Sequence, residues 1–162
     1  MIMNIRKYQS SDIPSMTELW NEVVDAGNAF PQEEKLSLTD AESFFAAQSC
    51  CGVAQDKNGT VLGLYILHPN NVGRCGHICN ASYAVSSSAR GKHIGEMLVR
   101  DSIEAGKALG FSILQFNAVV ESNLAARSLY EKLGFHQLGV IPKGFRMKDG
   151  HYENICPYYI EL

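Results

Sequence analysis

The sequence predicts an α/β fold: a mixed, mostly antiparallel sheet of about seven strands with helices on both faces. Three strand-like segments, at 51–55, 61–68 and 77–85, follow one another across short turns, as in an antiparallel meander. The third is followed by a helical pattern and then by a β-rich segment at 112–120. A β-helix-β unit of this kind requires a parallel, right-handed crossover, so the sheet is expected to be mixed.

The other elements are predicted from caps, hydrophobic periodicity and glycine stops. Residues 10–12 read Ser-Ser-Asp and are expected to cap a helix that tolerates Pro14 in its first turn. Gly27, Asn28 and Pro31 mark residues 26–37 as a loop. The remaining expected elements are a strand at 4–8, helices at 39–48, 94–109 and 123–133, and strands at 135–140 and 155–160.

Composition limits the class of protein. The 162 residues suit one domain, expected to span 1–162, and 46% of them are hydrophobic, enough for a core. Lys and Arg (14) are fewer than Asp and Glu (17), so nucleic-acid binding driven by bulk charge is not expected. The apolar run from Val61 to Leu67 is far short of the ~20 residues that span a bilayer. The start of the chain lacks the apolar core of a secretory signal, so a cytoplasmic protein without membrane contact is expected.

The five cysteines do not suggest disulfides or a metal site. Their number is odd and Cys50 and Cys51 are adjacent, so reduced thiols are expected. Cys75, His77 and Cys79 would share one face of a strand. A line of side chains does not converge on one point as tetrahedral zinc ligands must, and no metal is predicted.

One stretch is typical of a phosphate site. Residues 85–95 read VSSSARGKHIG and lie between a predicted strand and a long helix. Small residues at a helix start expose backbone N–H groups at the positive end of the helix dipole, and Arg90 and Lys92 add cationic side chains there. The alternative is an ordinary strand-to-helix turn. The Gly-Lys-Ser/Thr end of a Walker loop is absent.

A second pattern pairs Asn123 with Tyr130 on a predicted helix. Seven residues are close to two helical turns, so both side chains face the same way, roughly 10 Å apart. Taken alone, Asn123 is more simply a helix cap and Tyr130 a core aromatic residue.

Together the two segments resemble the GNAT superfamily of acyl-CoA-dependent N-acyltransferases, whose order of elements matches nearly the whole chain. The family's cofactor loop reads Gln/Arg-x-x-Gly-x-Gly/Ala after a strand ending in Val, and Arg90, Gly91, Lys92, Ile94 and Gly95 fit it. His93 stands where the middle Gly is usual, so we expect an altered backbone path or weaker affinity. The family's later pattern is met at Asn123, Ala126, Tyr130, Gly134 and Phe135.

The resemblance implies an acetyl-CoA site. Backbone groups of Tyr83 and Val85 would bind the pantetheine amides, in a gap between the strand at 77–85 and that at 112–120. The loop from Arg90 to Gly95, with Lys92 and His93, would hold the pyrophosphate. Tyr130 would protonate the leaving thiolate and Asn123 would position the cofactor arm.

Many relatives carry a carboxylate base on the strand that here spans 77–85, and this chain has none. We expect water ordered by Asn80, with Asn117, to accept the amine proton, or a low-pKa amine to need little help. Asn80 is equally explained as a residue filling a gap in the sheet, and His77 as a packed or edge histidine.

Other charged candidates lie outside this strand. Glu33 and Glu34 are candidates for an acceptor's ammonium, although a solvated acidic loop explains them better. Lys143, Arg146 and Lys148 suit an acceptor carboxylate, the CoA phosphates or a solvated edge.

The function predicted is an acetyl-CoA-dependent N-acetyltransferase for a small amine, such as an amino acid or an analogue, by direct attack on the thioester. Shorter matches, at His77–Tyr83, Phe116–Asn117 and Ile141–Gly144, resemble a subgroup that includes the yeast N-acetyltransferases of proline analogues such as azetidine-2-carboxylate. The alternatives are a protein (lysine or N-terminal) acetyltransferase and a non-catalytic acyl-CoA-binding module, with a flavodoxin-like domain more distant. Relatives are commonly dimers, so a homodimer is expected.

Overall fold

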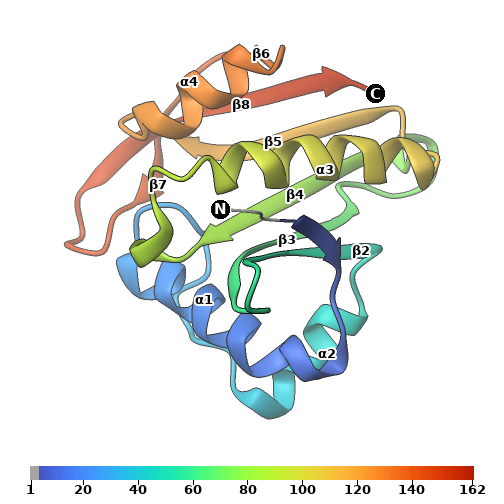
Figure 1. Cartoon of the computed structure of the whole chain (residues 1–162). Helices are drawn as coiled ribbons and strands as arrows, with labels where there is room; N and C mark the ends of the chain where they lie inside the picture. Colours follow the sequence, from blue (N-terminus) through green and yellow to red (C-terminus); the bar gives the residue numbers. More distant parts are fainter. Residues whose placement is uncertain (1–3) are drawn as a thin grey trace.

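A computed structural model describes residues 4–162, which form one eight-stranded sheet flanked by helices (Figure 1). The strand order is β1-β2-β3-β4-β5-β8-β6, with β7 also paired to β8. The strands are β1 (Asn4–Lys7), β2 (Cys50–Gln55), β3 (Val61–Pro69), β4 (Ile78–Val85), β5 (Ile113–Val120), β6 (His136–Gln137), β7 (Ile141–Arg146) and β8 (Tyr152–Glu161). The helices are α1 (Ile13–Ala26), α2 (Leu38–Ala46), α3 (Ile94–Ala108) and α4 (Leu124–Lys132), with 3₁₀ turns η1 (Ser10–Asp12), η2 (Gly73–Cys75) and η3 (Ser87–Ala89).

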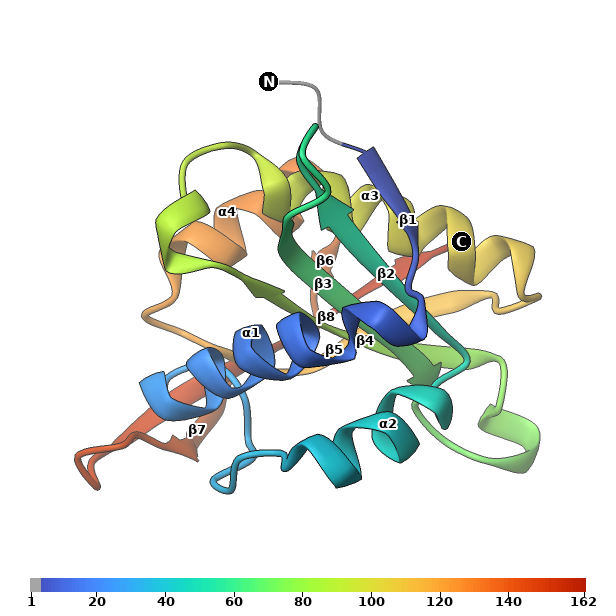
Figure 2. The same ribbon diagram turned by 60° about the horizontal axis from the view of Figure 1, so that its bottom comes forward.

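The helices divide between the two faces of the sheet, as predicted (Figure 2). Helices α1 and α2 pack their apolar sides on β2 and β3, with Trp20, Phe45 and Leu64 at the centre of that core. Helices α3 and α4 cover the opposite face, where Leu98, Leu114 and other side chains form a second core. No helix within residues 4–162 is long and apolar enough to cross a membrane.

The sequence predicted this architecture with one strand too few. Strand β7 was missed because its segment contains Pro142, Gly144 and a left-handed Lys143 (φ 55°), which break the alternating pattern of a strand. The strand expected at 135–140 is reduced to the two residues of β6, and the one expected at 155–160 is longer at its start. Cys75 lies in η2 and not on the strand assumed for it.

Every neighbouring pair in the sheet is antiparallel except β4 and β5. Their parallel ladder joins only Ile78 to Ile113 and Cys79 to Leu114. Beyond this ladder, residues 80–85 of β4 and residues 115–120 of β5 do not pair with each other, six residues in each strand. The predicted crossover is confirmed, and a gap opens in the middle of the sheet.

Candidate active site

A side chain closes the narrow end of the gap between β4 and β5. Directly after the last paired residue of β4, Asn80 donates its side-chain N–H to the main-chain oxygen of Gln115 at 2.8 Å. This bond takes the place of the next backbone bond in the ladder. Asn80 therefore fills the gap in the sheet with its Nδ2 atom, as one of the two interpretations predicted. Its Oδ1 atom accepts no hydrogen bond from residues 4–162.

Backbone polar groups of β4 face the gap. The Ser86 N–H donates to the carbonyl of Leu62 on the β3 side at 2.9 Å. In this register the even-numbered residues of β4 direct their backbone N–H and C=O groups toward β3. Because pairing sides alternate along a strand, the odd-numbered residues turn their N–H and C=O groups toward β5. Tyr83 and Val85 are among them, at the positions predicted for amide binding. An extended ligand placed in the gap would meet these groups as a neighbouring strand does.

The phosphate loop lies at the open end of the gap, where β4 leads through η3 into α3. Gly91 and His93 both have left-handed backbones, with φ of 76° and 60°. The backbone N–H groups of residues 90–96 form no hydrogen bond with residues 4–162. A turn of this shape at a helix N-terminus is an anion site. His93 takes up the left-handed conformation that glycine adopts readily.

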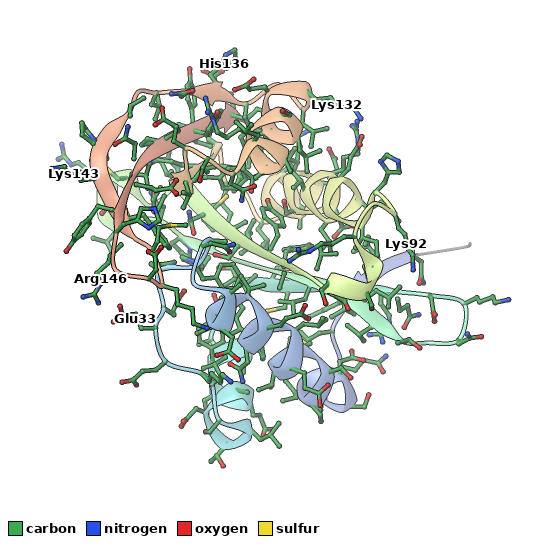
Figure 3. All side chains as sticks on the ribbon, turned by 90° about the vertical axis from the view of Figure 1, so that its left-hand side faces the viewer. Glu33, Lys92, Lys132, His136, Lys143 and Arg146 are labelled. Atoms are coloured by element: carbon green, nitrogen blue, oxygen red, sulfur yellow. The ribbon has the colours of Figure 1, made fainter. Side chains whose placement is uncertain are left out.

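The side chains around this loop favour anions. Arg90 and Lys92 are exposed and form no salt bridge within residues 4–162. Lys92 projects away from the body of the molecule in Figure 3. Ile94, by contrast, is buried and anchors the start of α3 in the core, while Gly95 leaves room beside Leu129. The loop is therefore fixed on one side and cationic on the other.

The gap and the loop belong to one cleft of about 1330 Å³. Ten of the eleven residues predicted for the site line it; Lys92 alone among them does not. The cleft also extends over the other face of the sheet, between α1, α2 and β3, where Phe30, Phe44 and Ile66 are among its walls. It thus passes through the sheet, with room for one ligand in the gap and a second above it.

Tyr130 of α4 packs against β5 beside the gap. Its ring lies against Phe116 of β5, with ring centroids 4.4 Å apart, and also contacts Phe135 and Tyr158. Burial raises the pKa of Tyr130 well above its ordinary value, and the neighbouring Tyr158 adds to the shift. Its hydroxyl forms no hydrogen bond within residues 4–162, although it borders the cleft. A protonated phenol thus remains available to a ligand.

Asn123 is the N-cap of α4, as its sequence position predicted. Its side-chain oxygen accepts the backbone N–H of Ala126 at 3.2 Å. The side-chain N–H₂ group has no partner within residues 4–162, and the residue borders the cleft. The capping and ligand-positioning interpretations therefore use different atoms.

Two of the charged candidates outside the gap, one acidic and one basic, form an ion pair with each other. Glu33, in the α1–α2 loop, forms a salt bridge with Arg146 of β7, and the two side chains meet in Figure 3. Lys148 donates to the main-chain oxygen of Asp25 at 2.5 Å. These contacts hold the α1–α2 loop against the β7–β8 hairpin around a second hollow of about 580 Å³. Among these charged residues, none borders the large cleft.

The structure adds a cleft residue that the sequence did not single out. His68 of β3 is paired directly with Asn80 of β4 in the sheet register, and both border the cleft. The register between β3 and β4 would have revealed it. Glu22 of α1 also borders the cleft and accepts the backbone N–H of Ser87 at 3.0 Å.

A split sheet, an anion loop at the start of the following helix and a phenol at the split define a class of acyl-CoA-dependent transferases. A family model described as the acetyltransferase (GNAT) family matches residues 14–135. The chain belongs to this family and is an N-acetyltransferase.

Named relatives agree with this assignment. The N-acetyltransferase aca1 of Schizosaccharomyces pombe is 30% identical over 162 residues, covering 90% of this chain and 77% of that protein. An L-methionine sulfoximine/L-methionine sulfone acetyltransferase of Pseudomonas paraeruginosa is 29% identical over 150 residues, covering 88% and 86%. A GCN5-related N-acetyltransferase structure from Kribbella flavida superposes with a TM-score of 0.91 at 32% identity, covering 99% and 98%.

Proposed function

We propose that this N-acetyltransferase transfers the acetyl group of acetyl-CoA to a small primary or secondary amine, such as an amino acid or an analogue. The observation that carries the proposal is the continuity of the gap with the phosphate loop. Backbone groups that lack partners line the gap at Tyr83 and Val85, and the unpaired N–H groups of residues 90–96 follow at its open end. A long ligand with amides at one end and phosphates at the other would meet the strand groups with its amides and the loop N–H groups with its phosphates.

In this proposal each part of the donor meets a group of matching chemistry. The loop from Gly91 to Gly95, with Arg90 and Lys92, holds the pyrophosphate, and His93 contributes its backbone. Tyr83 and Val85 pair with the pantetheine amides. Asn123 offers its free N–H₂ group to the same arm. Ile94 acts indirectly, by anchoring the helix whose N-terminus faces the phosphates.

Acetyl-CoA supplies the thioester that the acceptor amine attacks directly. The cleft brings the two reactants together, and proximity then provides much of the rate. Tyr130 faces the closed end of the gap, where it donates a proton to the leaving sulfur; its raised pKa keeps it protonated until then. Asn80, through its free Oδ1 atom, orders a water beside the amine, with Asn117 nearby.

The acceptor class rests on the part of the cleft above the sheet. Its walls carry uncharged polar side chains, among them Gln32, Gln48, Asn80 and Asn117, beside Phe30 and Phe44. Such a chamber suits a small polar amine better than an extended peptide. The name of the Pseudomonas paraeruginosa relative, which acts on methionine sulfoximine and sulfone, supports the same class. A cytoplasmic location, a homodimer and a single domain over 1–162 stay predictions.

Titration calorimetry with acetyl-CoA tests the donor site, with Arg90→Ala as the variant and Lys107→Ala as a surface control on the far end of α3. Micromolar binding that weakens about tenfold in Arg90→Ala alone supports the proposal. Mass spectrometry of reactions with L-methionine sulfone, L-methionine sulfoximine, azetidine-2-carboxylate and a lysine peptide then identifies the acceptor class. No binding of acetyl-CoA, or acetylation of the peptide alone, would overturn the proposed function.

A further inference from the structure

His68 lies where a base for the acceptor amine is needed. It is the direct cross-strand partner of Asn80, with which the gap begins. Side chains of directly opposed residues project from the same face of a sheet, with Cα atoms about 5.5 Å apart in a hydrogen-bonded pair. This is the face that α1 and α2 cover, opposite the face from which Tyr130 approaches. A proton donor and an imidazole therefore flank the closed end of the gap from its two sides.

The ring of His68 is held in a form that can accept a proton. Its Nδ1 atom lies 3.0 Å from the carbonyl oxygen of Pro69. A carbonyl only accepts hydrogen bonds, so Nδ1 carries the hydrogen in this contact and, in the neutral ring, Nε2 carries the lone pair. Nε2 has no partner within residues 4–162, and the half-buried residue borders the cleft.

His68 takes part in no ion pair within residues 4–162. Its cross-strand partner Asn80 is uncharged, as are Phe44 of α2 and Gln48 just after it, which border the same cleft. The nearest charged residue along the chain is Arg74 in η2, and neither an ion pair nor a hydrogen bond joins it to His68. No ion pair therefore competes with a ligand for the ring.

The acidic side chains of the cleft are engaged elsewhere. Glu22 is bonded to the N–H of Ser87, seven residues along the chain from Asn80, or roughly 23 Å of extended strand. Glu96 lies on α3, where Lys132 and Arg100 bind its carboxylate and lower its pKa to about 2. A carboxylate so stabilised is a weak base. His68 is left as the cleft's titratable group beside the closed end on the acceptor face.

We propose that His68 is the proton acceptor of the reaction, a role that rests on the proposed function and completes it. The acceptor ammonium gives one proton to His68 Nε2, directly or through one water held by Asn80 Oδ1. The neutral nitrogen then forms a bond to the thioester carbonyl carbon, the C–S bond breaks, and Tyr130 gives its proton to the departing sulfur. The second proton of the nitrogen passes through water in the cleft to the Tyr130 phenolate, which restores the phenol, and His68 returns the first proton to solvent.

The location of His68 is tested without any acceptor. Imidazole signals of the protein are followed by NMR while acetyl-CoA is added, with His68→Gln used to assign the His68 ring. We expect the His68 signal to move and the signal of the exposed His77, which does not border the cleft, to stay in place. An unchanged His68 signal in a protein that binds acetyl-CoA would place it away from the thioester and overturn the inference.

The role is tested by the pH dependence of turnover. His68→Gln keeps a polar side chain but removes the titrating ring, and His77→Gln is the matched control. With L-methionine sulfone, whose ammonium must lose a proton, His68→Gln should lower kcat/KM about 100-fold. It should also remove the part of the fall in kcat/KM at low pH that the ring causes. With methoxyamine, which is already neutral at pH 7, the loss should be less than about tenfold.

The outcomes separate the two proposals. Equal losses with both amines would mean that His68 only shapes the cleft, and full activity in His68→Gln would remove it from the mechanism. If the wild-type protein binds acetyl-CoA but does not acetylate L-methionine sulfone, the acceptor class is wrong, and the NMR titration still decides where His68 lies.

Discussion

The rings of Tyr130 and Phe116 lie with their centroids 4.4 Å apart and their planes inclined by 41°. Phe116 belongs to β5 just after the strand has left β4, and Tyr130 lies near the end of α4. This contact holds the Tyr130 ring against β5, two residues beyond the end of the β4–β5 ladder at Leu114. It attaches α4, which carries the second sequence motif, to the strand that forms one side of the gap.

Tyr130→Phe should lower kcat about 100-fold while leaving the Kd for acetyl-CoA unchanged, because the phenol acts on the leaving sulfur and the ring itself is kept. Burial raises the pKa of Tyr130, so its acidic form persists as pH rises beyond the ordinary tyrosine value. The wild-type rate should therefore show no alkaline loss from this group up to about pH 10. Steady-state kinetics over pH 6–10 provides the measurement.

Tyr158→Phe is the control for this variant. It also removes a phenol beside Tyr130, but one whose hydroxyl is already bonded to Glu131 at 2.9 Å and to Arg127 at 3.1 Å. Its kcat should stay within about tenfold of wild type, below the range of a lost proton donor. Equal losses in both variants would argue against Tyr130 as the proton donor.

His93→Gly should stabilise the protein without changing the site. His93 has a left-handed backbone (φ 60°, ψ 16°), which costs a non-glycine residue about 1–2 kcal/mol. Glycine removes that strain but loses about 0.5–1 kcal/mol in chain entropy, so the free energy of unfolding should rise by about 0.5–1 kcal/mol. His93→Ala keeps the strain and should show no gain. Urea unfolding measures both variants; a loss of stability in His93→Gly would refute the argument.

Much of the site could be predicted from sequence because its signals are local. The phosphate loop is a run of small and basic residues between a strand and a helix, and the cap at Asn123 follows from its position before α4. Backbone geometry dictates these features within a few residues. The left-handed turn at His93 also lies in the predicted loop, although its side chain gave no sign of it.

The acceptor side was harder to predict because it depends on contacts between distant segments. The alignment of His68 with Asn80 requires the register of β3 against β4, and the Glu33–Arg146 pair joins residues 113 positions apart. Strand β7 was missed for the opposite reason, since its local pattern is broken by proline and glycine while its pairing with β8 supports it. Tertiary pairing decides both cases.

Asp12 should make the fold sensitive to acid. Its buried carboxylate accepts two hydrogen bonds from Arg6, at 2.7 and 2.9 Å, and one from the Gln9 N–H at 2.8 Å. The Arg6 side chain lowers the pKa of Asp12, against the effect of burial. Its stabilisation is therefore complete above the ordinary pKa near 3.8 and disappears as pH falls through the lower, folded-state value.

Asp12→Asn should accordingly lower the free energy of unfolding by about 2 kcal/mol at pH 7, and by less at pH 3. Chemical unfolding at both pH values measures the difference. Asp56→Asn, in an exposed turn, serves as the control for removing one carboxylate. A loss in Asp12→Asn that is the same at both pH values would mean that its charge contributes nothing.

Gly27→Ala should disturb the acceptor end of the cleft and spare the donor end. Gly27 ends α1 with a left-handed backbone (φ 61°), and an added Cβ would lie 2.7 Å from the Cβ of Lys148 in the β7–β8 hairpin. Strain and the close contact together should cost more than about 1 kcal/mol and push the α1–α2 loop away from the hairpin. Because Phe30 in this loop borders the cleft, the KM for the amine should rise while the Kd for acetyl-CoA stays constant.

Gly59→Ala is the control: Gly59 is also left-handed, but an added Cβ there would meet open space, so this variant isolates the backbone strain. An amine KM that changes no more than in Gly59→Ala would show that the loop does not shape the acceptor site.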